Sequence, residues 1–155
     1  MKKITFFLGI LILPLISFGQ LNQNEFLTTI EWINQNPSQS NDEVFVSKSA
    51  DLIKFQIFNY PSFPINTSGT SELSREWKGH KYERYFLIVY SFNQLYYKIE
   101  NKKFDKLEAY LFSMNQLLKS YSNLIEESPE FKIGIFDEYA KLSQKDLKKR
   151  IKKLI

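Results

Sequence analysis

Apolar positions are densest in residues 82–99, where twelve of eighteen residues are apolar or aromatic and neither glycine nor proline interrupts the run. We interpret this stretch as a helix. Its polar residues are scattered around an otherwise apolar circumference, so neighbouring elements must cover it on several sides. The pattern predicts an all-α fold, in which five to six helices form a compact bundle around this central, aromatic-rich helix.

Two helices are predicted before the central one. Residues 24–36 carry apolar side chains at helical spacing and stop before Pro37. The second helix is expected over about residues 41–60, with Ser40 as N-cap and Glu43 completing a capping box. Its β-branched and aromatic residues also permit a strand, but its length without turn residues favours a helix. Its core stripe is predicted to be Val46, Ala50, Ile53 and Ile57, widened by Phe45, Leu52, Phe55 and Phe58.

Three helices are predicted after the central one. Residues 104–125 are expected to pack antiparallel against the central helix, because only a short polar link separates the two. Ser128 as N-cap and Pro129 as first helical residue predict a further helix that runs to about residue 142, with Gly134 inside it. Ser143 then caps a last helix, residues 144–155. The core seam of the first of these helices is predicted to be Leu107, Leu111, Met114, Leu118, Tyr121 and Ile125.

The longest predicted loop is residues 61–70, where prolines, a glycine and hydroxyl residues exclude a continuing helix. Phe63 and Ile65 within it are expected either to plug the end of the bundle or to stand over a pocket. If they stand over a pocket, Trp77 and His80 from the following segment complete the candidate ligand-binding residues, together with tyrosines of the central helix.

His80 is the single histidine of the sequence and lies between Glu76 and Glu83. One interpretation is a general base with carboxylate support, or one metal ion. However, Gly79 breaks the helical register that would align Glu76 with His80, and the chain offers neither a second histidine nor a cysteine as a further ligand. A polar connecting segment explains all of these residues and is the favoured interpretation, so the sequence predicts no catalytic residue, no metal site and no cofactor.

The last predicted helix is strongly basic, since residues 141–155 contain seven basic residues and one acid. A basic amphipathic helix is typical of proteins that lie on an anionic membrane or lipopolysaccharide surface. The alternative is a terminal helix whose narrow apolar stripe docks on the body while its lysines face solvent. The candidate contacts to an anionic surface are Lys145, Lys148, Lys149, Arg150, Lys152 and Lys153.

Residues 1–19 have the pattern of a secretory signal peptide. Lys2 and Lys3 precede the apolar residues 4–17, and the small residues Ser17 and Gly19 predict cleavage after Gly19. The apolar run is shorter than the roughly 20 residues of a membrane span, so we expect no transmembrane segment after cleavage. An uncleaved N-terminal anchor is the alternative. The pattern predicts an exported protein, periplasmic or secreted.

Residues 20–155 then form one domain of 136 residues, with 19 basic and 17 acidic side chains. The basic excess is confined to the tail, and the rest of the domain is mildly acidic, so we expect no nucleic-acid partner. The sequence contains no cysteine, which excludes disulfides, thiol chemistry and cysteine-based metal sites. Stability must therefore come from packing, for which aromatic side chains are abundant.

The export signal, the W-I-N-Q-N-P run at residues 32–37, the aromatic central helix and the lysine-rich end resemble uncharacterised small exported all-helical proteins of Gram-negative bacteria. This resemblance implies a helical fold and assigns no activity.

The first functional hypothesis is a non-enzymatic exported binding or interaction module of the cell envelope, whose partner would be a protein or an anionic envelope surface. The second is docking to a membrane or envelope surface through the basic C-terminal helix. The third is a hydrolase that uses carboxylates, for which the sequence fixes no suitably spaced pair of acids.

Overall fold

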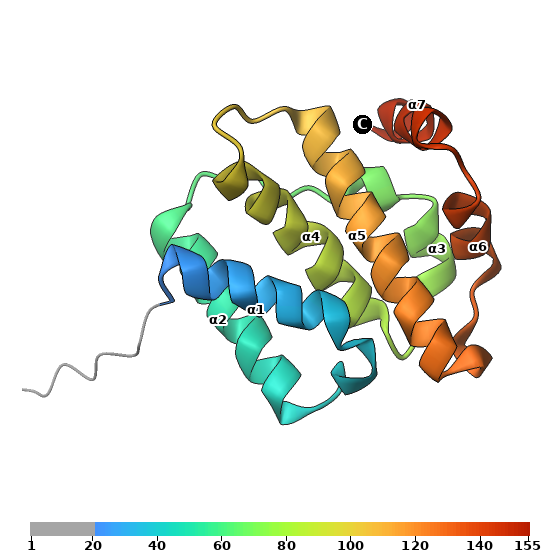
Figure 1. The fold of residues 1–155 in the computed structure, drawn as a ribbon, viewed down its shortest axis with the longest axis horizontal. Helices are drawn as coiled ribbons and strands as arrows, with labels where there is room; N and C mark the ends of the chain where they lie inside the picture. Colours follow the sequence, from blue (N-terminus) through green and yellow to red (C-terminus); the bar gives the residue numbers. More distant parts are fainter. Residues whose placement is uncertain (1–20) are drawn as a thin grey trace, which may run out of the picture.

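The structure is a computed structural model that describes residues 21–155, and the predicted signal peptide with its cleavage site after Gly19 lies outside these residues. The described residues form helices and turns without a β-strand, which confirms the all-α prediction (Figure 1). They contain seven α-helices rather than five to six. The elements are α1 (Gln23–Gln35), η1 (Pro37–Gln39), α2 (Glu43–Asn59), η2 (Ser68–Thr70), α3 (Leu73–Trp77), α4 (Glu83–Glu100), α5 (Lys106–Glu127), η3 (Pro129–Phe131), α6 (Gly134–Ala140) and α7 (Gln144–Leu154).

Helix α4 is the predicted central helix, displaced by one residue, and it runs antiparallel beside α5 in the middle of the molecule (Figure 1). Aromatic rings from α1, α2, α3, α5 and α6 reach it. The ring centroids of Trp77 in α3 and Phe136 in α6 lie 5.4 and 5.0 Å from that of Phe86. Phe45 in α2 lies 5.9 Å from Tyr85. The apolar circumference read from the sequence is therefore covered on several sides.

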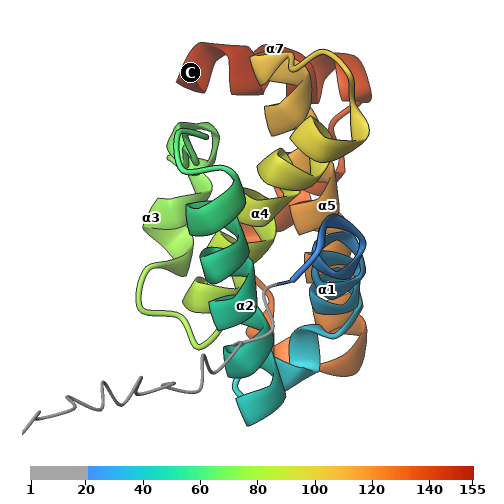
Figure 2. The same ribbon diagram turned by 90° about the vertical axis from the view of Figure 1, so that its left-hand side faces the viewer.

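Helices α1 and α2 form a pair beside α4 (Figure 2). The rings of Phe26 and Phe55 stack between them with centroids 4.6 Å apart, which places the start of α1 against the end of α2. The pair is therefore an antiparallel hairpin. A capping box begins α1, since the Asn22 side chain accepts from the backbone of Glu25 and the Glu25 carboxylate accepts from the backbone of Asn22.

The prediction for α2 was wrong in its cap and in its buried face. Ser40 ends η1 instead of capping α2, and Asp42 takes the N-cap position without a side-chain hydrogen bond. Among the predicted stripe residues, Val46, Ile53 and Ile57 are exposed. Phe45, Leu52 and Phe55, which were predicted to widen the stripe, are buried together with Ser49, whereas Phe58 is exposed. The two faces carry apolar residues at the same helical spacing, so periodicity alone did not distinguish them.

Helix α5 buries a broader face than the predicted seam. Met114, Leu118 and Tyr121 are buried as expected, but Leu107, Leu111 and Ile125 are only partly buried. The helix packs against α4 and α1 and also against α6, α7 and η2, so residues on both sides of the seam are enclosed. The fully enclosed residues that the seam omits include Ala109, Tyr110, Ser113, Leu117, Ser120 and Leu124.

The predicted helix after Ser128 is divided in two. Pro129 begins the short η3, Ser128 makes no side-chain cap, and α6 starts at Gly134 rather than passing through it. Between them Ile133 is extended, and its backbone N–H donates to Tyr121 Oη at 2.7 Å. The Tyr121 hydroxyl thus fixes the backbone of Ile133, where the helix is interrupted.

Helix α7 begins at the predicted cap, where Ser143 Oγ accepts from the Asp146 backbone at 3.2 Å. Its apolar stripe lies against the body, because Leu147 and Ile151 are buried. Among residues 21–155, no helix combines the length and apolar character that crossing a bilayer requires.

Candidate functional site

The loop of residues 61–70 is clamped onto α4. The amide of buried Gln94 donates to the Asn66 carbonyl at 2.7 Å and accepts from the Asn66 N–H at 3.3 Å, as a neighbouring strand would. Gly69 then lies on Tyr90, so closely that an added Cβ would be 2.2 Å from Tyr90 Oη. These contacts hold the loop against the central helix, beside a hollow of about 250 Å³ that is lined by Pro64, Asn66, Phe104, Lys106 and Tyr110.

The structure places the four candidate ligand-binding residues in two separate regions. Phe63 and Ile65 are half-buried near the C-terminal end of α4, where Phe63 meets Phe104 at 5.4 Å. Trp77 is buried in the core, and His80 lies beside the first residues of α4. With a rise of about 1.5 Å per residue, the two regions are roughly 20 Å apart along α4. One small ligand therefore does not contact all four side chains.

His80 is partly buried against aromatic rings. Its centroid lies 5.8 Å from those of Tyr82 and Phe131, and Tyr82 donates its backbone N–H to Nδ1 at 3.2 Å. Burial lowers the pKa of His80, which favours the neutral ring. The neighbouring Glu83 accepts from the backbone of Gly79 at 2.7 Å, so this carboxylate holds the turn before α4.

The basic residues of α7 divide into two groups. Lys148 pairs with Glu108 of α5, and Arg150 pairs with Glu72 at 2.7 Å while its guanidinium lies 4.4 Å from the ring centroid of Tyr139. These two cations fasten the helix to the body. The remaining four candidate residues, Lys145, Lys149, Lys152 and Lys153, are exposed.

A polar cleft of about 260 Å³ lies among α1, α4 and α5, in a region that the sequence did not single out. Helices α1, α4 and α5 lie against one another (Figure 1). Five amide side chains, two aromatic rings and two opposite charges line it. The lining residues are Glu31, Asn34, Gln35, Asn93, Tyr96, Phe112, Gln116, Lys119 and Asn123.

The floor of the cleft is a pair of amides. Asn93 Nδ2 donates to Asn34 Oδ1 at 2.9 Å, and Asn34 Nδ2 donates back to Asn93 Oδ1 at 3.2 Å. Asn93 is almost fully buried, and its amide also donates to the Val89 carbonyl at 2.7 Å. The Asn34 carbonyl, near the end of α1, accepts from Ser120 at 2.9 Å. These bonds fix the orientation of the amides before any ligand arrives.

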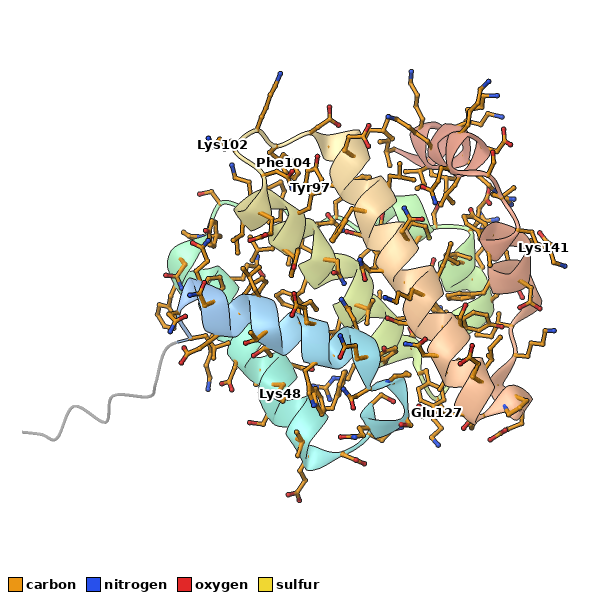
Figure 3. All side chains as sticks on the ribbon, viewed as in Figure 1. Lys48, Tyr97, Lys102, Phe104, Glu127 and Lys141 are labelled. Atoms are coloured by element: carbon orange, nitrogen blue, oxygen red, sulfur yellow. The ribbon has the colours of Figure 1, made fainter. Side chains whose placement is uncertain are left out.

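One wall of the cleft is aromatic. The ring of Tyr96 stacks on Phe112 with centroids 5.7 Å apart, and its hydroxyl donates to Glu31 Oε1 at 2.9 Å. Burial, together with the neighbouring Glu31 carboxylate, raises the pKa of Tyr96 to about 12. Tyr96 therefore remains a neutral donor at physiological pH and holds Glu31 at the rim. Figure 3 draws the side chains of the described residues as sticks on the ribbon of Figure 1, with Tyr97, the residue after Tyr96, labelled.

The lining is suited to binding rather than to acid–base chemistry. Amides both donate and accept hydrogen bonds, but they do not exchange protons near neutral pH. Among the described residues, Glu31 is the one carboxylate that lines the cleft, so the paired acids of a glycosidase-type mechanism are not assembled there. Within residues 21–155, no group of three or more histidines and carboxylates is placed to hold a metal ion.

A second hollow, beside α7, contains two carboxylates, Glu72 and Asp146. The hydrogen bond from Tyr139 lowers the pKa of Glu72, and the hydrogen bond from Ser143 lowers the pKa of Asp146. Both groups stay ionised at neutral pH, so neither is poised as a general acid. A hydrolase therefore gains no support from this pair.

Two signals in the sequence could have indicated the cleft. Asn93 is a polar residue in the most apolar segment of the chain, and a buried amide needs a fixed partner. The polar Gln116, Lys119 and Asn123 follow Phe112 at helical steps of four, three and four, beside the predicted seam. Polar residues at such spacing usually form a solvated face, so only the packing of α1 across α4 and α5 identifies them as a cleft.

A scan of protein-family models and searches of curated proteins and of solved structures find no match to this chain.

Proposed function

We propose that this chain is a non-enzymatic binding module of the bacterial cell envelope that holds a neutral polar ligand of the carbohydrate class in the cleft among α1, α4 and α5. The observation that carries the proposal is the fixed Asn34–Asn93 amide pair beside the stacked rings of Tyr96 and Phe112. The pattern of residues 1–19 supports an exported protein, and envelope glycans are then accessible to it.

The chemistry of the lining favours a sugar over a charged ligand. A sugar hydroxyl donates one hydrogen bond and accepts others, and Asn34, Gln35 and Gln116 offer both kinds of partner. The apolar face of a sugar ring packs against an aromatic ring such as Tyr96 or Phe112. Glu31 and Lys119 carry opposite charges, so the cleft has no net charge that would select an anion or a cation.

The size of the cleft limits the ligand to about one sugar ring. Its volume of about 260 Å³ is slightly below the range for drug-sized ligands, which begins at roughly 300 Å³. A hexose has about twelve heavy atoms, and about 0.3 kcal/mol per atom gives roughly 4 kcal/mol of binding free energy. The expected Kd for one ring is therefore on the order of 1 mM, and a longer glycan binds more tightly only if it contacts the rim.

Calorimetric titration of the purified protein with neutral and N-acetylated oligosaccharides tests the proposal. Gln116→Ala removes a rim amide without entering the core, and it should weaken binding about tenfold. Asn115→Ala is the matched control, because Asn115 is the preceding residue on α5 but pairs with Gln144 outside the cleft. Equal loss in both variants, or no binding of any glycan at millimolar concentration, would contradict the proposal.

Docking to an anionic envelope surface through α7 is the second candidate function. It is supported by the four lysines that stay exposed while Leu147 and Ile151 attach the helix to the body. Each cation near an anionic surface contributes about 1 kcal/mol at low ionic strength. Replacing Lys145, Lys149, Lys152 and Lys153 by Gln should therefore abolish binding to anionic vesicles, whereas replacing the exposed Lys78 and Lys141 should not. Unchanged vesicle binding in the quadruple variant would refute this function.

A further inference from the structure

Helix α2 carries an apolar face that nothing in the described residues covers. Of the six exposed large hydrophobic residues in residues 21–155, five lie on this helix. Their exposed fractions run from 40% for Ile53 to 69% for Phe58. The opposite face is fully used, because Phe45, Leu52 and Phe55 are buried against α1 and α4. An exposed apolar helix face of this kind marks an interaction surface. Val46, Ile53 and Ile57 share this face, whereas Val44 and Phe58 are exposed on its flank, beyond Lys54.

The spacing along this face is that of a helix-pairing seam. Val46, Ala50, Ile53 and Ile57 follow each other at steps of four, three and four, which is the pattern of alternating a and d positions. The small Ala50 near the middle allows a second helix to approach closely. We name these four residues the α2 seam.

We propose that the α2 seam pairs with the α2 seam of a second copy of this chain in an antiparallel, two-fold symmetric dimer. The seam is symmetric about its midpoint, so a two-fold axis there sets Val46 against Ile57 of the partner subunit and Ala50 against Ile53 of the partner subunit. An isologous interface requires this self-complementarity, and most soluble oligomers use such interfaces. The proposal is independent of the function proposed for the cleft.

The flanks of the seam are also complementary in the antiparallel arrangement. Lys54 and Asp51 form an ion pair at 3.5 Å on one edge of the seam. The two-fold axis brings Lys54 within one helical turn of the partner subunit's Asp51, so the edges attract.

A second copy explains this face better than a lipid surface does. Helix α2 contains two acids and two lysines, so it has no excess positive charge to attract anionic lipids. Side chains of this size expose about 150 to 200 Å² when fully accessible, so the exposed fractions of Val46, Ile53 and Ile57 give roughly 200 to 300 Å² of apolar seam per copy. For the two copies together this apolar area is below the roughly 1,200 Å² of standard interfaces, so we expect a weak, reversible dimer with a Kd in the upper micromolar range.

Sedimentation velocity of the purified protein from about 1 to about 500 μM tests the association. Val46→Glu and Ile57→Lys each place two unpaired charges in the interface and should weaken the dimer at least tenfold. Ile155→Lys changes an exposed hydrophobic residue on another part of the chain and is the matched control, which should dimerise as the unchanged chain does. Circular dichroism verifies that each variant keeps its helical fold.

The register is tested by combining the two charges. A mixture of the Val46→Glu and Ile57→Lys variants should form a heterodimer, because the introduced carboxylate of one chain then faces the introduced ammonium of the other, while the second Val46–Ile57 contact is unchanged. The double variant in one chain should regain homodimerisation. A monomer throughout the concentration range, or separate variants that fail to associate when mixed, would overturn the proposal. So would a monomer that binds lipid vesicles and loses that binding through Val46→Glu.

Discussion

The packing of the 61–70 loop against α4 depends on the contact between Gly69 and Tyr90. A Cβ at Gly69 would lie 2.2 Å from Tyr90 Oη, well inside contact distance. The Tyr90 side chain is fully buried and cannot move aside without disturbing the rings around it. Gly69→Ala therefore overpacks the core, and we expect it to lower the free energy of unfolding by about 1 to 3 kcal/mol.

Tyr90→Phe provides the complementary change. Tyr90 Oη is buried and has no hydrogen-bond partner among the described residues. Removing the hydroxyl should therefore leave stability unchanged or raise it by about 1 kcal/mol, because a buried polar group without a partner is unfavourable. With the oxygen absent, the added Cβ of Gly69→Ala would meet Tyr90 Cζ at 3.4 Å, which is an ordinary contact.

Urea unfolding of the four proteins, followed by circular dichroism, measures the coupling. The double variant should be more stable than the two single changes predict together, by about 1 to 2 kcal/mol. Strictly additive effects would show that Gly69 and Tyr90 do not touch. A loss of more than about 1 kcal/mol in Tyr90→Phe would show that the hydroxyl has a partner, and would contradict this packing of the loop.

Three further predictions concern the scaffold. Asn22→Ala removes the capping box of α1 and should lower the free energy of unfolding by about 1 kcal/mol in urea. Trp77→Ala leaves a cavity between α3, α4 and α6 and should lower the free energy of unfolding by about 3 to 5 kcal/mol in the same assay. The hydrogen bond from Tyr139 lowers the pKa of Glu72 from its ordinary value of 4.5, so its stabilising effect is complete above that pH and is lost as the pH falls through the lowered pKa. The free energy of unfolding, measured from neutral to acidic pH, should therefore depend less on pH in Glu72→Gln than in the unchanged chain. An unchanged pH dependence would disprove this role of Glu72. Glu130→Gln, at an exposed site, is the control.

The sequence predicted the helices well where one face is apolar and the ends carry clear signals. Helix α4 is offset by one residue from its prediction, and α7 begins at the expected Ser143 cap. The helix predicted to pass through Gly134 instead begins there. The interruption depends on Tyr121, whose contact with Ile133 joins segments that the sequence cannot place together.

Helix α2 shows why the buried face could not be read from periodicity. Both of its faces repeat apolar residues at helical steps, and only the position of Phe26 and Tyr85 beside Phe55 and Phe45 selects the inner one. The remaining apolar face is the α2 seam. Self-association would explain why this helix has apolar residues on a second face.

The candidate site was missed because its residues come from three helices. Asn34 and Asn93 are far apart in sequence, and their pairing requires α1 to cross α4 at one particular place. The predicted pocket residues, in contrast, are near each other in sequence. In the structure, Phe63 and Trp77 nevertheless lie near opposite ends of the central helix.

Nuclear magnetic resonance mapping with a ¹⁵N-labelled sample tests the binding account most directly, because the side-chain amides of the cleft give their own signals. Titration with neutral oligosaccharides should shift the amide signals of Asn34, Asn93, Gln116 and Asn123 together, with a common Kd near or below about 1 mM. Shifts restricted to α7 or to the α2 seam, or no shifts with any glycan, would contradict a carbohydrate-binding cleft.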